Sequence, residues 1–312
     1  MANVGFAVPD DTVLVADGGL ATELEARGAD LSDPLWSARL LVEHPEEIAA
    51  VHAAFFAAGA QIATTASYQA SFDGFAARGI DRRTAYGLLR RSVGLARNAG
   101  GDVPGRWVAA SVGPYGAARA DGSEYVGRYG LSIAQLSSWH RPRLEVLAGA
   151  GADLLALETV PDLDEAAALV GLVQEANVPA WLSYTIDGTA TRAGQPLAEA
   201  FAVAAGVPQI VAVGVNCCAP DDVLPAIEIA AEVTGKPVVA YPNSGEHWSS
   251  GGWTEPARFS PALVPQWVAA GARIVGGCCR VSPADINELA AAVSRLKRRT
   301  CTQRENPAGN SR

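Results

Sequence analysis

Histidine is scarce in this chain of 312 residues, which contains only His44, His52, His140 and His247. None of the four follows an apolar run of strand type, and no His-x-His motif follows the first such run. Catalytic zinc sites built from histidine need two or three of these side chains around one ion. The sequence therefore argues against a zinc hydrolase with histidine ligands.

Long apolar runs and an excess of positive charge are also missing. No apolar run reaches the roughly 18 residues that a membrane-spanning helix needs. Residues 1–10 lack the basic and then apolar order of a signal peptide, so we expect none. Lys and Arg number 24 against 33 Asp and Glu, which gives a net charge of -9. This balance argues against nucleic acid and anionic membranes as partners, and it favours a cationic small molecule.

Cysteine is present in only five copies, four of which form the adjacent pairs Cys217–Cys218 and Cys278–Cys279. Small secreted proteins that depend on disulfides use many more cysteines in a much shorter chain. The pattern fits a reducing compartment better than a disulfide framework. We therefore expect a cytoplasmic protein.

Short apolar runs of strand type alternate with helical stretches along almost the whole chain. Eight such runs occur, at residues 13–16, 61–66, 107–112, 154–157, 180–186, 210–215, 237–241 and 273–275. Alternation of this kind predicts an α/β fold with a parallel sheet, and eight units predict a single-domain (β/α)8 barrel of the TIM type. An open, doubly wound sheet is the alternative, but no Gly-x-Gly-x-x-Gly turn follows the first run. We expect the barrel over residues 1–296 and a disordered tail over 297–312.

The segment 114–130 is unusually long for a connection inside a barrel. It carries four glycines and three tyrosines. Connections of this length inside a compact domain are usually functional or mobile. A solvated insertion without a function is an equally good interpretation from the sequence alone.

The two cysteine pairs follow the sixth and the eighth run. Active-site residues of such a barrel come from the carboxyl ends of its strands, so these thiols are expected to meet. We predict that Cys217, Cys278 and Cys279 bind one Zn²⁺, which leaves a fourth position for a thiol substrate that binds as a thiolate. The alternative is that the cysteines are small buried hydrophobic residues. The glycines before Cys278 favour the metal site, because they would let the backbone bend there.

Two carboxylates, Asp17 and Glu158, directly follow apolar runs and should be partly buried. A buried carboxylate needs a partner. That partner could be an internal cation or a helix N-terminus. It could equally be the ammonium group of an amino-acid substrate, the interpretation that we favour for Glu158.

Several motifs together resemble the zinc-dependent homocysteine S-methyltransferases over about residues 12–296. The most specific are Gly-Val-Asn-Cys at 214–217 and Gly-Gly-Cys-Cys at 276–279. Supporting motifs are Asp-Gly-Gly at 17–19, Tyr-Gln-Ala-Ser at 68–71, Ser-Val-Gly-Pro-Tyr-Gly at 111–116, Asp-Gly-Ser-Glu-Tyr at 121–125, Glu-Thr at 158–159 and Tyr-Pro-Asn-Ser-Gly-Glu at 241–246. One departure is Cys218, where the family pattern has a small hydroxyl residue.

The resemblance implies a (β/α)8 barrel in which the thiolates of Cys217, Cys278 and Cys279 and the sulfur of homocysteine surround zinc. We further predict that Asp17, Glu158, Thr159 and Asn216, which lie at the ends of the expected strands, bind homocysteine. The chain looks most like the branch that takes its methyl group from a sulfonium donor, S-methylmethionine or S-adenosylmethionine, and forms methionine. Betaine-dependent transfer, a hydrolase that activates water at zinc and a non-catalytic zinc or thiol-binding barrel are the alternatives. A cationic donor could rest on the ring of Trp36, Tyr115 or Trp248.

Overall fold

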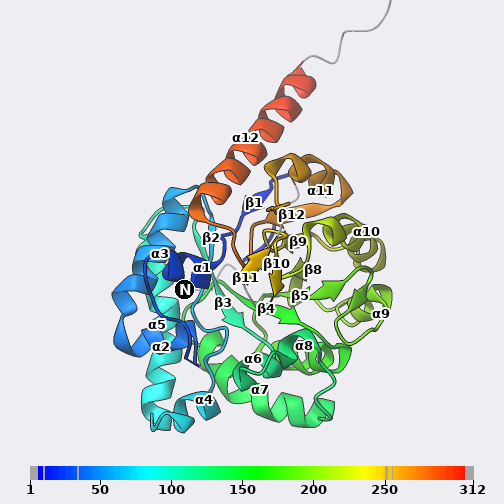
Figure 1. Cartoon of the computed structure of the whole chain (residues 1–312). Coiled ribbons are helices and arrows are strands. Elements are labelled where there is room, and N and C mark those ends of the chain that lie inside the picture. Colours follow the sequence, from blue (N-terminus) through cyan, green and yellow to red (C-terminus); the bar gives the residue numbers. More distant parts are fainter. Residues whose placement is uncertain (1–5, 10, 34, 250–251, 255, 306–312) are drawn as a thin grey trace, which may run out of the picture.

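A computed structural model describes residues 6–9, 11–33, 35–249, 252–254 and 256–305. For residues 247–249, 252–254 and 299–305 it describes only the backbone. Eight parallel strands form one sheet in the order β1-β12-β9-β8-β5-β4-β3-β2. A parallel bridge between Ala16 and Ile62 joins the first strand to the second and closes the barrel. The expected (β/α)8 fold is confirmed (Figure 1).

Each barrel strand coincides with one of the eight predicted runs. The strands are β1 (Leu14–Val15), β2 (Ile62–Thr64), β3 (Trp107–Val112), β4 (Leu154–Val160), β5 (Ala180–Tyr184), β8 (Ile210–Asn216), β9 (Val238–Tyr241) and β12 (Ala272–Val275). Two antiparallel hairpins are added, β6 (Ile186–Asp187) with β7 (Ala190–Thr191) and β10 (His247–Ser249) with β11 (Gly252–Thr254). The first of these hairpins takes up the end of the fifth predicted run, so β5 is shorter than expected.

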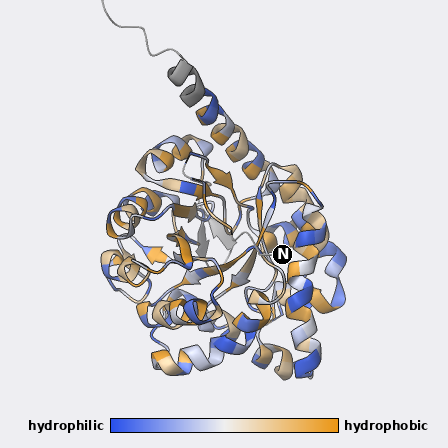
Figure 2. Cartoon of the chain, turned by 180° about the vertical axis from the view of Figure 1, so that it is seen from behind, coloured by the Kyte–Doolittle hydropathy of each residue, from blue (hydrophilic) through white to orange (hydrophobic). Residues whose placement is uncertain are grey.

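Helices surround the barrel and connect its strands. They are α1 (Leu20–Ala26), α2 (Ser37–Glu43), α3 (Pro45–Ala57), α4 (Phe72–Ala77), α5 (Arg82–Gly100), α6 (Tyr115–Arg119), α7 (Ile133–Ala148), α8 (Leu163–Ala176), α9 (Leu197–Ala202), α10 (Val223–Thr234), α11 (Val264–Ala270) and α12 (Pro283–Glu305). Short 3-10 turns occur at η1 (Ser123–Tyr125), η2 (Pro220–Asp222) and η3 (Pro261–Leu263). Many hydrophilic segments lie on these outer helices, whereas several strands are strongly apolar (Figure 2).

The apolar core has two layers. The larger cluster lies between the strands and the helices, and a smaller one, which includes Leu154, Ala156 and Trp181, fills the barrel interior. Phe6 joins the interior cluster and packs edge-on against Trp107, with ring centroids 5.3 Å apart. Alternate residues of a strand face the same side, so Glu158 follows Leu154 and Ala156 into the interior.

The last helix extends beyond the predicted boundary at residue 296. α12 continues to Glu305 and projects from the barrel (Figure 1). Its extension contains Lys297, Arg298 and Arg299, which favour helix, and no proline or glycine occurs before Pro307. The first part of the expected tail is therefore helical, and residues 306–312 lie outside the described part of the chain. No helix within the described residues combines the length and apolar character required to cross a lipid bilayer.

Candidate metal centre and substrate pocket

Three cysteine thiols meet at the carboxyl end of the barrel. The Sγ atoms of Cys217, Cys278 and Cys279 all lie within 4.8 Å of one another, and those of Cys217 and Cys279 are 3.8 Å apart. Tetrahedral zinc with Zn–S bonds of about 2.3 Å would hold neighbouring sulfurs roughly 3.8 Å apart. The three thiols therefore suit zinc in both chemistry and spacing. Cys218 lies elsewhere, buried in the apolar layer between strands and helices.

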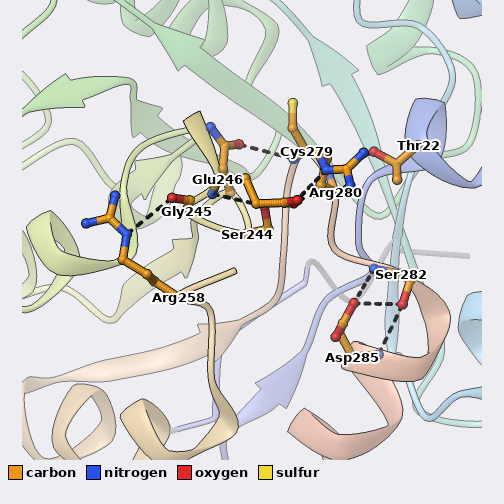
Figure 3. Close-up of polar contacts among 10 residues, drawn as sticks. Thr22, Ser244, Gly245, Glu246, Arg258, Cys279, Arg280, Ser282 and Asp285 are labelled. Atoms are coloured by element: carbon orange, nitrogen blue, oxygen red, sulfur yellow. Dashed lines mark hydrogen bonds and ion pairs between the residues drawn. The ribbon is translucent and has the colours of Figure 1, made fainter. Parts of the chain in front are cut away.

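The backbone around the thiols departs from regular strand. Cys217 follows directly after β8 and has φ of 52°, whereas β12 ends at Val275, before its two cysteines. The backbone N–H of Cys278 donates to the carbonyl of Pro242, and that of Cys279 donates to Asn243 Oδ1 at 3.1 Å. The loop after β9 therefore fixes the two cysteines that follow β12, as the hydrogen bond to Cys279 in Figure 3 illustrates.

The two glycines before Cys278 act through packing and not through an unusual φ. Neither Gly276 nor Gly277 is among the residues with positive φ. A Cβ on Gly277 would lie 2.2 Å from Val281 Cγ1, and one on Gly276 would lie 2.9 Å from the carbonyl oxygen of Asp17. The strand break that we expected before Cys278 is present, since β12 ends at Val275, directly before the two glycines. The absence of a side chain at Gly276 and Gly277 lets neighbouring segments of the chain approach the cysteine-bearing loop closely.

An ion pair joins the loop after β9 to the residue that follows the cysteines. Arg280 Nε lies 2.6 Å from one carboxylate oxygen of Glu246, and its Nη2 lies 3.1 Å from the other (Figure 3). Arg280 has φ of 62°, and its backbone N–H donates to Thr22 Oγ1 at 2.8 Å. Residues in rarely populated backbone conformations persist where surrounding contacts fix them. Helix α1 and the loops after β9 and β12 are thus tied together beside the thiols.

The protonation of the thiols is shared within the cluster. Hydrogen bonds from Cys278 and Cys279 hold the pKa of Cys217 well below its usual range, and burial opposes this effect. The pKa of Cys278 is raised well above its usual range, first because its thiol donates to Cys217. One thiolate stabilised by neighbouring donors is a good starting point for binding a cation.

A pocket of about 300 Å³ opens directly onto the three thiols. Its lining includes Glu158, Thr159 and Asn216, together with Trp36, Tyr68, Tyr125 and Tyr241. Ligand pockets commonly combine aromatic walls with a few polar groups. The pocket therefore brings the candidate metal ligands together with three of the four predicted substrate-binding residues.

Glu158 is the buried acid that faces this pocket. It is 7% exposed, accepts a hydrogen bond from Ser111 Oγ and accepts another from the Tyr241 hydroxyl at 3.1 Å. Burial raises the pKa of its carboxyl to about 7, and the two hydroxyl donors oppose that shift. An ammonium group in the pocket would supply the positive charge that favours the ionised form.

Asp17 is engaged differently. Both of its carboxylate oxygens accept hydrogen bonds from Thr64, one from the backbone N–H at 2.7 Å and one from the hydroxyl at 2.6 Å. Burial raises the pKa of Asp17 to about 7. The pocket lining, as far as the chain is described, includes Glu158 but not Asp17. These contacts tie β1 to β2, whatever further role the carboxylate has.

Thr159 and Asn216 hold one another beside the thiols. Asn216 Oδ1 accepts from the Thr159 N–H at 2.8 Å, and Asn216 Nδ2 lies 2.7 Å from Thr159 Oγ1. Ser183 also donates to Asn216 Oδ1, at 2.7 Å. Thr159 has φ of 58°, and these contacts compensate for its rarely populated backbone conformation. Because Asn216 directly precedes Cys217, the same hydrogen bonds hold the backbone that carries the Cys217 thiol.

Some residues of the pocket could not be singled out from the sequence by the chemistry of their side chains. Tyr241 donates to Glu158, and the available signs were its position at the end of a predicted strand and in the motif at 241–246. Tyr125, the last residue of the motif at 121–125, reaches Cys217 from the 114–130 segment, for which a functional connection and a solvated insertion were equally good interpretations. Of the three rings considered for a cation, Trp36 lines the pocket, while Tyr115 packs against Tyr129 and Trp139. The side chain of Trp248 lies outside the described residues.

Comparisons with known proteins agree with this arrangement. The family model described as homocysteine S-methyltransferase matches residues 14–293. Homocysteine S-methyltransferase of Escherichia coli K12 is 48% identical over 89% of this chain and 94% of its own length. Homocysteine S-methyltransferase 4 of Zea mays is 46% identical over 93% of this chain and 92% of its own length.

A solved structure extends the comparison to the fold. The metallated form of the homocysteine methyltransferase MmuM from Escherichia coli superposes with a TM-score of 0.81 at 46% identity. The match covers 90% of this chain and 96% of that one. With a family model that matches most of its length and relatives of this similarity, the chain belongs to the homocysteine S-methyltransferase family.

Proposed function

We propose that this protein is an enzyme that transfers a methyl group from a sulfonium donor to the thiol of homocysteine, with Zn²⁺ held by Cys217, Cys278 and Cys279. The observation that carries the proposal is the convergence of three thiols within 4.8 Å of one another at the floor of a pocket. Membership of the homocysteine S-methyltransferase family supports the reaction. A metallated form of the E. coli relative supports a metal in this family.

The three cysteines provide the ligands, and the pocket leaves room for one more sulfur. Zinc bound there would lower the pKa of a coordinating thiol so that it is a thiolate, and therefore a nucleophile, at neutral pH. Asn243, Pro242 and Asn216 hold the ligand-bearing backbone by the hydrogen bonds described above. Because the ligand-bearing backbone is already held in place, the reacting groups lose less conformational freedom when they reach the transition state.

Glu158 binds the ammonium group of homocysteine in this proposal. Its carboxylate faces the pocket and its two hydroxyl partners carry no charge, so an ammonium ion is the missing counter-charge. Thr159 and Asn216 line the same wall and shape the space for the amino acid. Asp17 acts through Thr64, a pocket residue that it holds in place.

The methyl donor in this proposal is S-methylmethionine or another sulfonium. Trp36, Tyr68 and Tyr125 contribute aromatic surface to the pocket, and Trp36 packs edge-on to Tyr68 with ring centroids 6.3 Å apart. Aromatic faces attract cations by roughly 0.5–2 kcal/mol. As the methyl group leaves, the donor becomes a neutral thioether and loses this attraction, which favours its release.

Replacing Trp36 tests the donor site. Trp36→Leu keeps apolar bulk and removes the aromatic face, so we expect KM for the sulfonium donor to rise about 3-fold to 30-fold. KM for homocysteine should change by less than twofold. Trp36→Phe, which keeps an aromatic ring, is the control and should lie between Trp36→Leu and the wild type. Equal donor KM values for all three proteins would remove Trp36 from the donor site.

The reaction itself is tested by measuring methionine formation from homocysteine with S-methylmethionine, S-adenosylmethionine and betaine in parallel, with and without a chelator. We expect formation with a sulfonium donor and its loss on chelation. Formation with betaine alone would indicate the betaine-dependent reaction. Ester or amide hydrolysis without homocysteine would indicate a hydrolase, and homocysteine binding without transfer to any donor would indicate a binding protein.

The proposal also includes a cytoplasmic location and a functional unit of residues 1–296. Thiols that must remain reduced to bind metal suit the cytoplasm. The residues that line the pocket fall between Gly18 and Arg280, within the proposed homocysteine-binding unit of residues 1–296.

A further inference from the structure

Tyr125, whose ring lines the pocket, also reaches the metal centre through its hydroxyl group, which the proposed reaction has not yet used. Its hydroxyl lies 3.2 Å from the Sγ atom of Cys217, within hydrogen-bonding distance for sulfur. It belongs to η1, between β3 and α7, lines the pocket and is 40% exposed. A phenolic O–H can donate to a thiolate, which has no hydrogen of its own to donate.

The beginning of this segment is anchored by a fully buried polar cluster. Glu165 Oε1 accepts from the backbone N–H of Tyr115 at 2.6 Å and lies 2.8 Å from His140 Nε2. Arg143 donates to the carbonyl of Gly113, and its Nη2 lies 3.1 Å from His140 Nδ1. Glu165, His140 and Arg143 are at most 1% exposed. Buried groups paired in this way fix the backbone that they bind.

The end of the segment is anchored as well. The backbone N–H of Arg128 donates to Asp162 Oδ2 at 2.8 Å, and its Nε donates to the carbonyl of Ala193 at 2.8 Å. In between, η1 packs so closely on α6 that a Cβ on Gly116 would lie 2.4 Å from the nitrogen of Glu124. The placement of the hydroxyl beside Cys217 is therefore determined by the surrounding fold at both ends of the segment.

We propose that Tyr125 is a positioning residue of the metal centre, which donates its hydroxyl hydrogen to the Cys217 thiolate. The proposal rests on the metal site of the proposed function and adds a residue outside the ligand set. Partners that bind metal ligands fix ligand orientation and tune the electron density that the ligand gives the metal. A hydrogen bond to Cys217 withdraws electron density from that sulfur and holds it in one orientation.

The test compares Tyr125→Phe with the wild type and with the control Tyr86→Phe. Tyr125→Phe keeps the ring and loses only the hydroxyl. Tyr86→Phe makes the same change at a residue of α5 that is 47% exposed. Competition with a chromogenic chelator measures zinc affinity without any substrate. We expect Tyr125→Phe to bind zinc about tenfold more weakly, the lower end of the usual range for such partners, and Tyr86→Phe to match the wild type within twofold.

A spectroscopic measurement separates this role from simple packing. In the cobalt-loaded protein, the sulfur-to-cobalt charge-transfer band of Tyr125→Phe should move to lower energy, because a hydrogen bond no longer stabilises the sulfur lone pairs. Packing alone predicts no shift, since the ring remains. Wild-type zinc affinity and an unshifted band in Tyr125→Phe would overturn the proposal. Methionine formation by the wild type tests the proposed reaction separately, so the two failures are distinguishable.

Discussion

Replacing Cys217, Cys278 or Cys279 by serine, one at a time, is expected to remove zinc and methyl transfer together. A hydroxyl is a far poorer zinc ligand than a thiolate at neutral pH. Loss of a mere hydrogen-bonding partner of a ligand already costs 10-fold to 100-fold in affinity or activity, so loss of a ligand should exceed roughly 100-fold. Zinc per chain after dialysis and the rate of methionine formation measure the two effects.

Cys218→Ala provides the matched control for these variants. Cys218 is adjacent to Cys217 but is 1% exposed and belongs to the apolar layer between strands and helices. Burial raises the pKa of its thiol well above the usual range, which suits an inert core residue. The Cys218→Ala variant should therefore retain the zinc content of the wild type. If Cys217→Ser kept its zinc and Cys218→Ala lost it, the ligand would be Cys218.

Glu158→Gln should weaken homocysteine binding about 10-fold to 100-fold and leave zinc in place. A charge-assisted hydrogen bond is worth about 1.5–3 kcal/mol, and the amide keeps the shape of the carboxylate while it removes the charge. The amide can still accept from Ser111 or Tyr241, so the fold should persist. Titration calorimetry of homocysteine into the zinc-loaded variant measures the loss.

A thiol without the α-amino group gives the internal control for Glu158. The wild type should prefer homocysteine strongly over this analogue, and Glu158→Gln should discriminate far less. The alternative from the sequence was that Glu158 pairs with an internal arginine. Within the described residues, its hydrogen-bond partners are instead the hydroxyls of Ser111 and Tyr241. Unchanged homocysteine affinity in the variant would exclude the ammonium-binding role.

The sequence was sufficient to predict the barrel and the meeting of the thiols. Buried parallel strands are short apolar runs, and several of the runs here end where a polar residue such as Asp17, Glu158 or Asn216 follows. Because the carboxyl ends of barrel strands share one face, Cys217 and Cys278 could be placed together although 61 positions separate them.

Contacts made by loops could not be predicted in the same way. The hydrogen bond between Tyr125 and Cys217 depends on how Glu165 and Asp162 anchor a connecting segment, and no local periodicity encodes such anchoring. The close packing at Gly277 could not be predicted for a related reason: it depends on the side chain of Val281, which only the folded chain brings close. The extension of α12 to Glu305 shows that polar and basic composition does not by itself exclude a helix.

The central claim is that three protein thiolates surround one zinc and that homocysteine adds a fourth sulfur. X-ray absorption at the zinc edge counts sulfur neighbours directly, at Zn–S distances of about 2.3 Å. We predict three sulfurs in the zinc-loaded protein without substrate and four after homocysteine is added. Fewer than three sulfurs in the free protein, or a sulfur count that homocysteine leaves unchanged, would contradict the account.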